Sequence, residues 1–246
     1  MKAKLLIILS VVALLPCRMM AQEGEQHIGV NLGFSDVILR ARTQASSTKL
    51  DGKQPLYGFK AGVVYDATLV AGFGVQLGLN YTFGANVGNW QPINAFTTLR
   101  SRQDYIYHQL EIPIDWQYKF EIAKQTYLIV YTGPTIGIGL SLKQKPFVEQ
   151  YKDGQVVVQQ GTSQEMYDGD ADNDGRRDYF RTNVTWGVGA GFQYKNYFLR
   201  GGYDFGITSP YRDRYYDPLS ALYEGWNRKG RIDQWSIKLG MYIWQF

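Results

Sequence analysis

The feature that most constrains the fold of this chain is an alternation of apolar and small polar residues that recurs along its length. In the stretch GFGVQLGLNYTF, residues 72–83, odd positions are apolar or aromatic and even positions are Gly, Gln, Asn or Thr. Successive side chains of a β-strand point to opposite faces, so this period predicts strands with one apolar face each. No helical periodicity stands out after residue 21.

The alternation occurs in eight segments of roughly ten residues. These segments are residues 27–34, 57–65, 72–83, 105–120, 126–143, 183–194, 197–207 and 234–243. Short connections near 66–69, 121–125 and 195–196 alternate with long ones at 42–56, 84–104, 143–179 and 208–231. This asymmetry is typical of barrels with short periplasmic turns and long extracellular loops. The sequence therefore predicts an all-β fold, an eight-stranded antiparallel up-and-down transmembrane β-barrel.

The second face of the strands distinguishes a membrane barrel from a soluble one. A surface that meets water carries about a quarter to a third charged residues, whereas this face carries mostly Gly, Asn, Thr, Ser and Gln. Small residues fit the narrow interior of eight strands, so we expect a side-chain-filled lumen and an apolar face toward lipid. A soluble lipocalin-like barrel with an apolar interior is the alternative. The charges predicted to pair across the lumen are Lys60, Glu111, Asp115, Lys119, Arg200, Asp204 and Lys238.

The N-terminal segment has the features of an export signal. Lys2 and Lys4 precede an apolar run, and Ala21 offers a small-residue cleavage point. The run is shorter than the roughly 20 residues that a transmembrane helix needs. We therefore expect a signal peptide over residues 1–21 and a barrel domain over residues 22–246. Export of a barrel places the protein in the outer membrane of a Gram-negative bacterium.

Cleavage of this segment changes the charge and the cysteine content. It removes three basic residues and no acid, which lowers the formal charge from +4 to +1. The basic balance therefore does not indicate a nucleic-acid partner. Cys17 is the one cysteine, so the mature chain can form no disulfide. Lipid attachment at Cys17 is an alternative that its Pro16 neighbour disfavours.

Four stretches resemble, in order, the small outer-membrane barrels of the Bacteroidota called PorT-like. They are QLEIPIDWQYKF (109–120), YTGPTIGIGLSL (131–142), GAGFQYKNYFLRGGYDFGITS (189–209) and IKLGMY (237–242). The resemblance implies an eight-stranded, porin-like outer-membrane barrel. The family's namesake takes part in type IX secretion, so the resemblance also offers a role as an accessory subunit of an envelope machine.

The C-terminus departs from the pattern that such barrels follow. They usually end in Phe on the lipid-facing parity, which helps recognition by the assembly machinery. Here the apolar face of the last strand is odd-numbered and ends at Ile243, whereas the last residue is Phe246. A bulge before the terminus would restore the parity.

The run DADNDGRRD, residues 170–178, resembles a calcium loop. Carboxylates at positions 1, 3, 5 and 9 and glycine at position 6 match the pattern that wraps one hard cation. The predicted ligands are Asp170, Asp172, Asp174 and Asp178. Position 12 should be Glu but is Arg181, and no helices flank the loop. We expect a weak Ca²⁺ site, binding at about 10⁻⁴–10⁻³ M, that orders the loop; the alternative is a solvated acidic loop tip.

No residue pattern predicts catalysis or a required cofactor. His27 and His108 are the only histidines, and neither has a Cys or acidic cluster at metal-ligand spacing, so both are interpreted as wall residues. Glu111 and Asp115 share the inward face and could act as an acid–base pair. Ion pairing with basic residues inside the barrel is the favoured interpretation.

The last long connection is rich in Tyr, Arg and Trp, which are enriched at interaction hot spots. An envelope protein, lipopolysaccharide or a glycan could bind there, and an aromatic rim beside the outer-membrane lipids is the plainer interpretation. The sequence predicts a non-enzymatic outer-membrane barrel with a structural or loop-mediated interaction role. A subunit of an envelope machine and a narrow solute channel are the alternatives.

Overall fold

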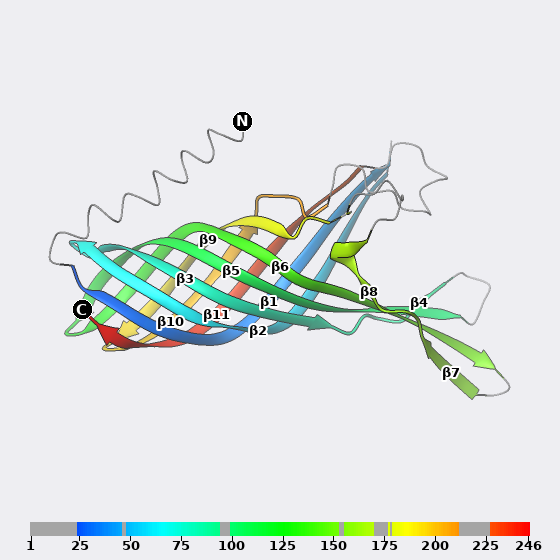
Figure 1. Cartoon of the computed structure of the whole chain (residues 1–246), viewed down its shortest axis with the longest axis horizontal. Coiled ribbons are helices and arrows are strands. Elements are labelled where there is room, and N and C mark those ends of the chain that lie inside the picture. The colour runs from blue at the N-terminus through cyan, green and yellow to red at the C-terminus, as the bar shows by residue number, and fades with distance from the viewer. Residues whose placement is uncertain are drawn as a thin grey trace.

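The computed structural model describes residues 24–45, 48–93, 99–152, 155–169, 177, 179–211 and 227–246, nearly all of them in antiparallel strands (Figure 1). The strands are β1 (Gln26–Ala45), β2 (Thr48–Val70), β3 (Phe73–Asn86), β4 (Gln91–Pro92), β5 (Arg100–Ala123), β6 (Thr126–Lys152), β7 (Gln155–Gln160), β8 (Gln164–Glu165), β9 (Thr182–Tyr194), β10 (Tyr197–Gly206) and β11 (Asn227–Gln245). A single 3₁₀ turn, η1 (Met166–Asp168), lies among these residues. No helix in the described ranges is long and apolar enough to cross a membrane.

Eight of the strands pair into a closed ring. The order β5-β3-β2-β1-β11-β10-β9-β6 is closed by pairing of β6 with β5. Apart from the short strands β4, β7 and β8, each strand pairs with the next one along the chain, and β11 pairs with β1. The predicted all-β antiparallel meander is confirmed.

The ring has a turn end, defined by its tight turns, and an opposite loop end. The turns at residues 124–125 and 195–196 lie where the sequence predicts them. The β2–β3 turn lies slightly later than the predicted 66–69, at Ala71 and Gly72, whose φ angles are 48° and 85°. Positive φ at both central residues is what a type I′ hairpin turn requires.

Several strands are much longer than predicted. β1, β2, β5 and β6 span 20, 23, 24 and 27 residues. The predicted loop at 42–56 is wrong, because β1 and β2 stay paired as far as Ala45 and Thr48. The alternation fades where the outer face stops being apolar, although backbone pairing continues. The predicted loops at 84–104, 143–179 and 208–231 are also shortened by strand residues.

The burial of side chains follows the predicted faces. On β1, Val30 and Leu32 are exposed, whereas Asn31 and Ser35 are buried. The same division holds around the ring, so the polar face lines the interior and an apolar belt covers the outside. The alternative barrel with an apolar interior is therefore wrong.

A β-bulge lies close to the C-terminus. Trp244 pairs with Ile28, whereas Tyr242 pairs with the next residue of β1, so Ile243 is the extra residue. Beyond the bulge the outward parity changes from odd to even, and Phe246 is exposed and stacks on Trp244 with ring centroids 6.3 Å apart. The bulge brings the terminal Phe onto the apolar face, which explains its apparent phase error.

Candidate functional site

The interior near the turn end is organised around Asp66, whose side chain is fully buried. Its carboxylate accepts hydrogen bonds from Gln76 Nε2 (3.3 Å), Gln117 Nε2 (2.9 Å), Lys119 Nζ (2.8 Å) and Tyr242 OH (2.7 Å). These donors lie on β3, β5 and β11, so one carboxylate on β2 connects strands across the ring. The sequence predicts Asp66 in a turn and gives no sign of this role, although its even number matches the inward parity of Lys60.

A buried ion pair lies farther along the interior. Lys60 Nζ is 2.6 Å from Glu111 Oε2, and the two side chains are 3% and 2% exposed. Thr82 Oγ1 donates a hydrogen bond of 2.8 Å to the other oxygen of Glu111. The pair joins β2 to β5 inside the ring. It confirms that the inward carboxylate is held by a lysine rather than free for acid–base chemistry.

A second buried pair completes this charged layer. Arg200 Nη2 lies 3.5 Å from Asp115 Oδ2, and the guanidinium lies 3.9 Å from the ring centroid of Tyr131. Lys238 is also buried, with a side chain that points into the same interior from β11. Both signs of charge are therefore present in this layer. The predicted pairing across the lumen is confirmed for Lys60, Glu111, Asp115, Lys119 and Arg200.

An apolar cluster, here called the plug, lies at the loop end of the interior. Its buried members are Val37, Leu56, Tyr107, Leu142, Tyr167, Tyr179, Tyr211 and Ile232. Five come from strands around the ring and three from the segments between strands. Tyr179 and Tyr211 form an isolated bridge with ring centroids 5.0 Å apart. The strand members surround the tyrosines from the loops, so the plug lies across the lumen.

The chemistry of the plug keeps it uncharged. Burial raises the pKa of the Tyr167 phenol to about 12, so this residue stays neutral at physiological pH. Sequence periodicity could not identify the three loop tyrosines, because they lie in segments without alternation. Their burial in the plug becomes visible only once the ring is closed and the loops pack into its loop end.

The turn end carries a recess with a volume of about 470 Å³. Lys119 and Gln193 lie among its lining residues. Lys119 already binds Asp66, so the recess ends on a satisfied ion pair. Among its lining residues, all in the described part of the chain, no three His, Cys, Asp or Glu side chains gather as a metal site would require.

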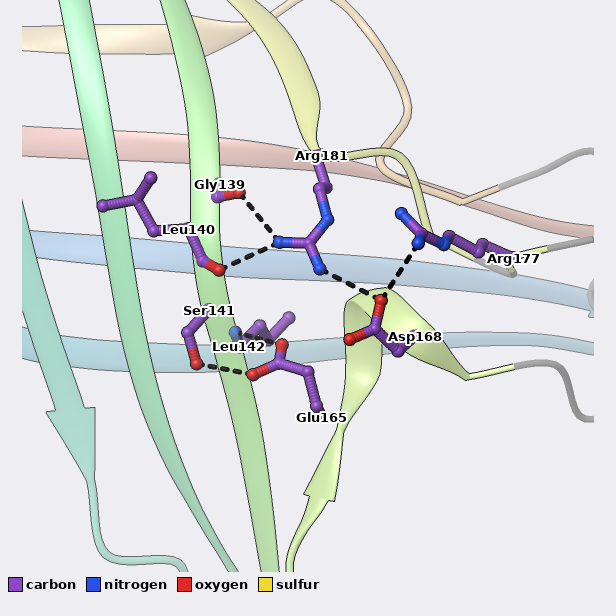
Figure 2. Close-up of polar contacts among 8 residues, drawn as sticks. All are labelled: Gly139, Leu140, Ser141, Leu142, Glu165, Asp168, Arg177 and Arg181. Carbon is purple, nitrogen blue, oxygen red and sulfur yellow. Dashed lines mark hydrogen bonds and ion pairs between the residues drawn. The ribbon is translucent and has the colours of Figure 1, made fainter.

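The segment that contains the predicted calcium loop is anchored to β6 on both sides (Figure 2). Arg181 Nη2 lies 3.0 Å from Asp168 Oδ1, and Arg177 Nη2 lies 3.5 Å from the same oxygen. Arg181 Nη1 also donates a hydrogen bond of 2.9 Å to the carbonyl oxygen of Leu140. The residue at loop position 12 is therefore bound to β6 and to Asp168.

Glu165 forms the other anchor, just before η1 (Figure 2). Its carboxylate accepts hydrogen bonds from Ser141 Oγ at 2.6 Å and from the backbone N–H of Leu142 at 2.7 Å. The chain from 165 to 181 thus begins and ends on one strand. The predicted ligands between these anchors lie outside the described residues: Asp170, Asp172, Asp174 and Asp178.

The two histidines that the sequence analysis interprets as wall residues have different partners. His27 is buried in the interior, with its ring centroid 4.8 Å from that of Tyr242. His108 Nδ1 is 2.6 Å from the hydroxyl of Tyr81 on the neighbouring strand. Within the described ranges, no three His, Cys, Asp or Glu side chains gather as a metal site would require. Residues 212–226 of the aromatic connection lie outside the described part.

Comparison with known proteins identifies the type of domain. A family model described as an outer membrane protein beta-barrel domain matches residues 20–212. The chain is similar to the attachment invasion locus protein Ail of Yersinia pestis, with 14% identity over 92% of this chain and 100% of that one and a TM-score of 0.35. It is also similar to the N-terminal β-barrel domain of Pseudomonas aeruginosa OprF, with 11% identity over 88% and 99% of the two chains and a TM-score of 0.29. No curated protein sequence matched.

Proposed function

Because the chain belongs to the outer membrane β-barrel domain family, we propose that its ring is an eight-stranded transmembrane barrel that presents its loop end outside the cell. A closed ring pairs every strand within the sheet, which hydrocarbon requires. The exposed apolar belt would meet the lipid. The tight turns and the C-terminus would face the periplasm, as in barrels with an even strand count. Residues 1–21, which lie outside the described ranges, would direct export.

The barrel's role would be to hold and present structure beyond the membrane rather than to conduct or catalyse. The observation that carries this proposal is the filled interior, where buried ion pairs are followed by the apolar plug. An aqueous path would have to pass both layers. The long strands would continue beyond the belt as a stiff support for the loops.

The filled interior predicts an electrically silent protein. Purified barrel reconstituted in a planar lipid bilayer should leave the conductance at the level of the bare membrane, because charged side chains and the plug occupy the lumen. Insertion is checked on the same sample by heat-dependent gel mobility and protease protection. Steady ohmic steps from the inserted wild-type barrel would overturn the closed-lumen proposal and restore the narrow solute channel.

A narrower role rests on the motifs that resemble PorT-like barrels. The four motifs fall on β5, β6, β9–β10 and β11. These strands are consecutive in the ring, and β1, β2 and β3 make up the rest of it. On this resemblance the protein would be an accessory subunit of an envelope machine such as the type IX secretion system. An envelope protein would then bind the extracellular loops.

The loop between the Glu165 and Arg181 anchors is expected to bind calcium weakly. Arg181 is held against Asp168 and β6, which compensates its charge at the base of the loop. Calorimetry on the reconstituted barrel should show binding at about 10⁻⁴–10⁻³ M. The matched variant Asp172→Asn with Asp174→Asn should lose the heat. An absence of heat from the wild type at millimolar calcium would leave a solvated acidic loop.

A further inference from the structure

Strand β7 has one edge that is paired with no other strand of the described residues. It pairs along one side with β6, from Lys152 opposite Gln155 to Phe147 opposite Gln160. It ends the strand order, and no described strand pairs with its other side. Figure 1 shows the β6–β7 hairpin projecting away from the ring.

The sequence of β7 lacks the usual protection of a sheet edge. QVVVQQ contains no charge and no proline, and Val156, Val157 and Val158 are 60%, 39% and 51% exposed. Exposed edges are normally protected by Lys, Pro or bulges, because their free N–H and C=O groups pair with other strands. An uncharged β-branched run on a projecting hairpin is therefore suited to strand addition.

The hydrogen-bond pattern shows which residues face the open edge. The N–H of Gly161 donates to the carbonyl of Pro146 at 2.9 Å, so these residues form a bonded position of the ladder. Bonded and non-bonded pairs alternate in an antiparallel ladder. Val157 is four residues before Gly161 and therefore also occupies a bonded position, with its backbone groups directed toward β6. Val156 and Val158 occupy non-bonded positions, so their backbone groups point to the open side.

The segment from Gln155 to Gln159 reads the same in both directions. Antiparallel pairing of two copies about Val157 places Val156 of one copy opposite Val158 of the other. Both residues direct their backbone groups outward, so each such pair can exchange two hydrogen bonds. If the two-fold axis passed between two residues, a residue whose backbone groups point outward would lie opposite one whose groups point toward β6, and the pair could not form its hydrogen bonds. The bonding parity thus requires an axis through a residue, and the palindrome selects Val157 among such axes because it places identical residue types opposite one another.

We propose that two copies of this chain associate through antiparallel pairing of their β7 edges about a two-fold axis at Val157. The contact is isologous, with the same segment used by both copies. Its partner is a second copy, and it joins the two projecting sheets into one. This inference rests on the proposed function in one respect, since the hairpin must stand clear of the lipid.

Single-cysteine cross-linking tests the register. In a chain with Cys17→Ser, a cysteine at Val157 would face itself in a non-bonded pair with Cα atoms about 4.5 Å apart, which suits a disulfide. Mild oxidation of the purified barrel in detergent should give a covalent dimer. The matched variant Gln155→Cys would lie about 13 Å from its own copy and should stay uncross-linked. Equal cross-linking at both positions would reject this register.

Backbone substitution tests the edge itself. Val158→Pro removes an outward N–H and keeps the bonding toward β6, which is where an edge strand tolerates proline. Sedimentation in detergent should show a dimer for the wild type and for Val158→Thr, and loss of the dimer for Val158→Pro. A wild type that stays monomeric at every concentration would overturn the inference. If that monomer remains folded and non-conducting, the proposed function stands without the dimer.

Discussion

Asp66→Ala is expected to lower the free energy of unfolding by about 3–5 kcal/mol, the range for removing one partner of a buried ion pair. Asp66 is fully buried, and its loss leaves Lys119 as an uncompensated charge and Tyr242 without its acceptor. Urea unfolding of the barrel in lipid vesicles, followed by tryptophan fluorescence, would measure the change. The variant should also unfold at a lower urea concentration without a change in barrel size on gels.

An exposed acid provides the matched control for this experiment. Asp168 pairs with two arginines at the loop end, but its side chain is 53% exposed. Asp168→Ala should cost no more than about 1 kcal/mol, because solvent screens exposed pairs. Equal losses for the two variants would show that the carboxylate on β2 is not the centre of a buried network.

Lys60→Met should destabilise the barrel to a similar degree, by about 3–5 kcal/mol. The substitution leaves the Glu111 carboxylate, 2% exposed, without its lysine at 2.6 Å. Methionine retains the apolar stem of lysine, so the loss reports mainly on charge. The same unfolding measurement in vesicles applies.

A second substitution separates the charge from the packing. In Lys60→Met with Glu111→Met no buried charge of this pair remains, and apolar replacement of a buried pair is often nearly neutral. The double variant should recover most of the stability lost by Lys60→Met. Additive losses would mean that Glu111 is stabilised by other groups, such as Thr82.

The sequence predicted the faces of the barrel because the two faces of each strand meet different surroundings. Leu32 and Asn31 alternate because one is exposed on the apolar belt and the other is buried with polar neighbours. The inward charges follow the same parity, so their pairing across the ring was predictable. The identity of each partner was not, because it depends on the register between strands distant in sequence. Lys60 meets Glu111 and Arg200 meets Asp115 only after that register is set.

The parts that were missed lie where the alternation carries no information. Beyond the apolar belt both faces of a strand can be polar, so the pairing of Ala45 with Thr48 is not marked by any alternation in the sequence. Tyr167 and Tyr179 enter the plug from irregular segments, whose course follows from tertiary packing. The calcium-like loop stays a prediction, because its aspartates lie outside the described residues.

The distribution of the buried ion pairs has a consequence for the order of assembly. Lys60 with Glu111 and Asp66 with Lys119 both join β2 to β5, which belong to the N-terminal half of the ring. Those charges can neutralise one another as soon as four ring strands have associated. The other buried carboxylate on β5, Asp115, finds its arginine only on β10. The two lysine–carboxylate pairs of the first half of the barrel are thus complete before the second half joins, whereas Asp115 is neutralised only by a strand of the second half.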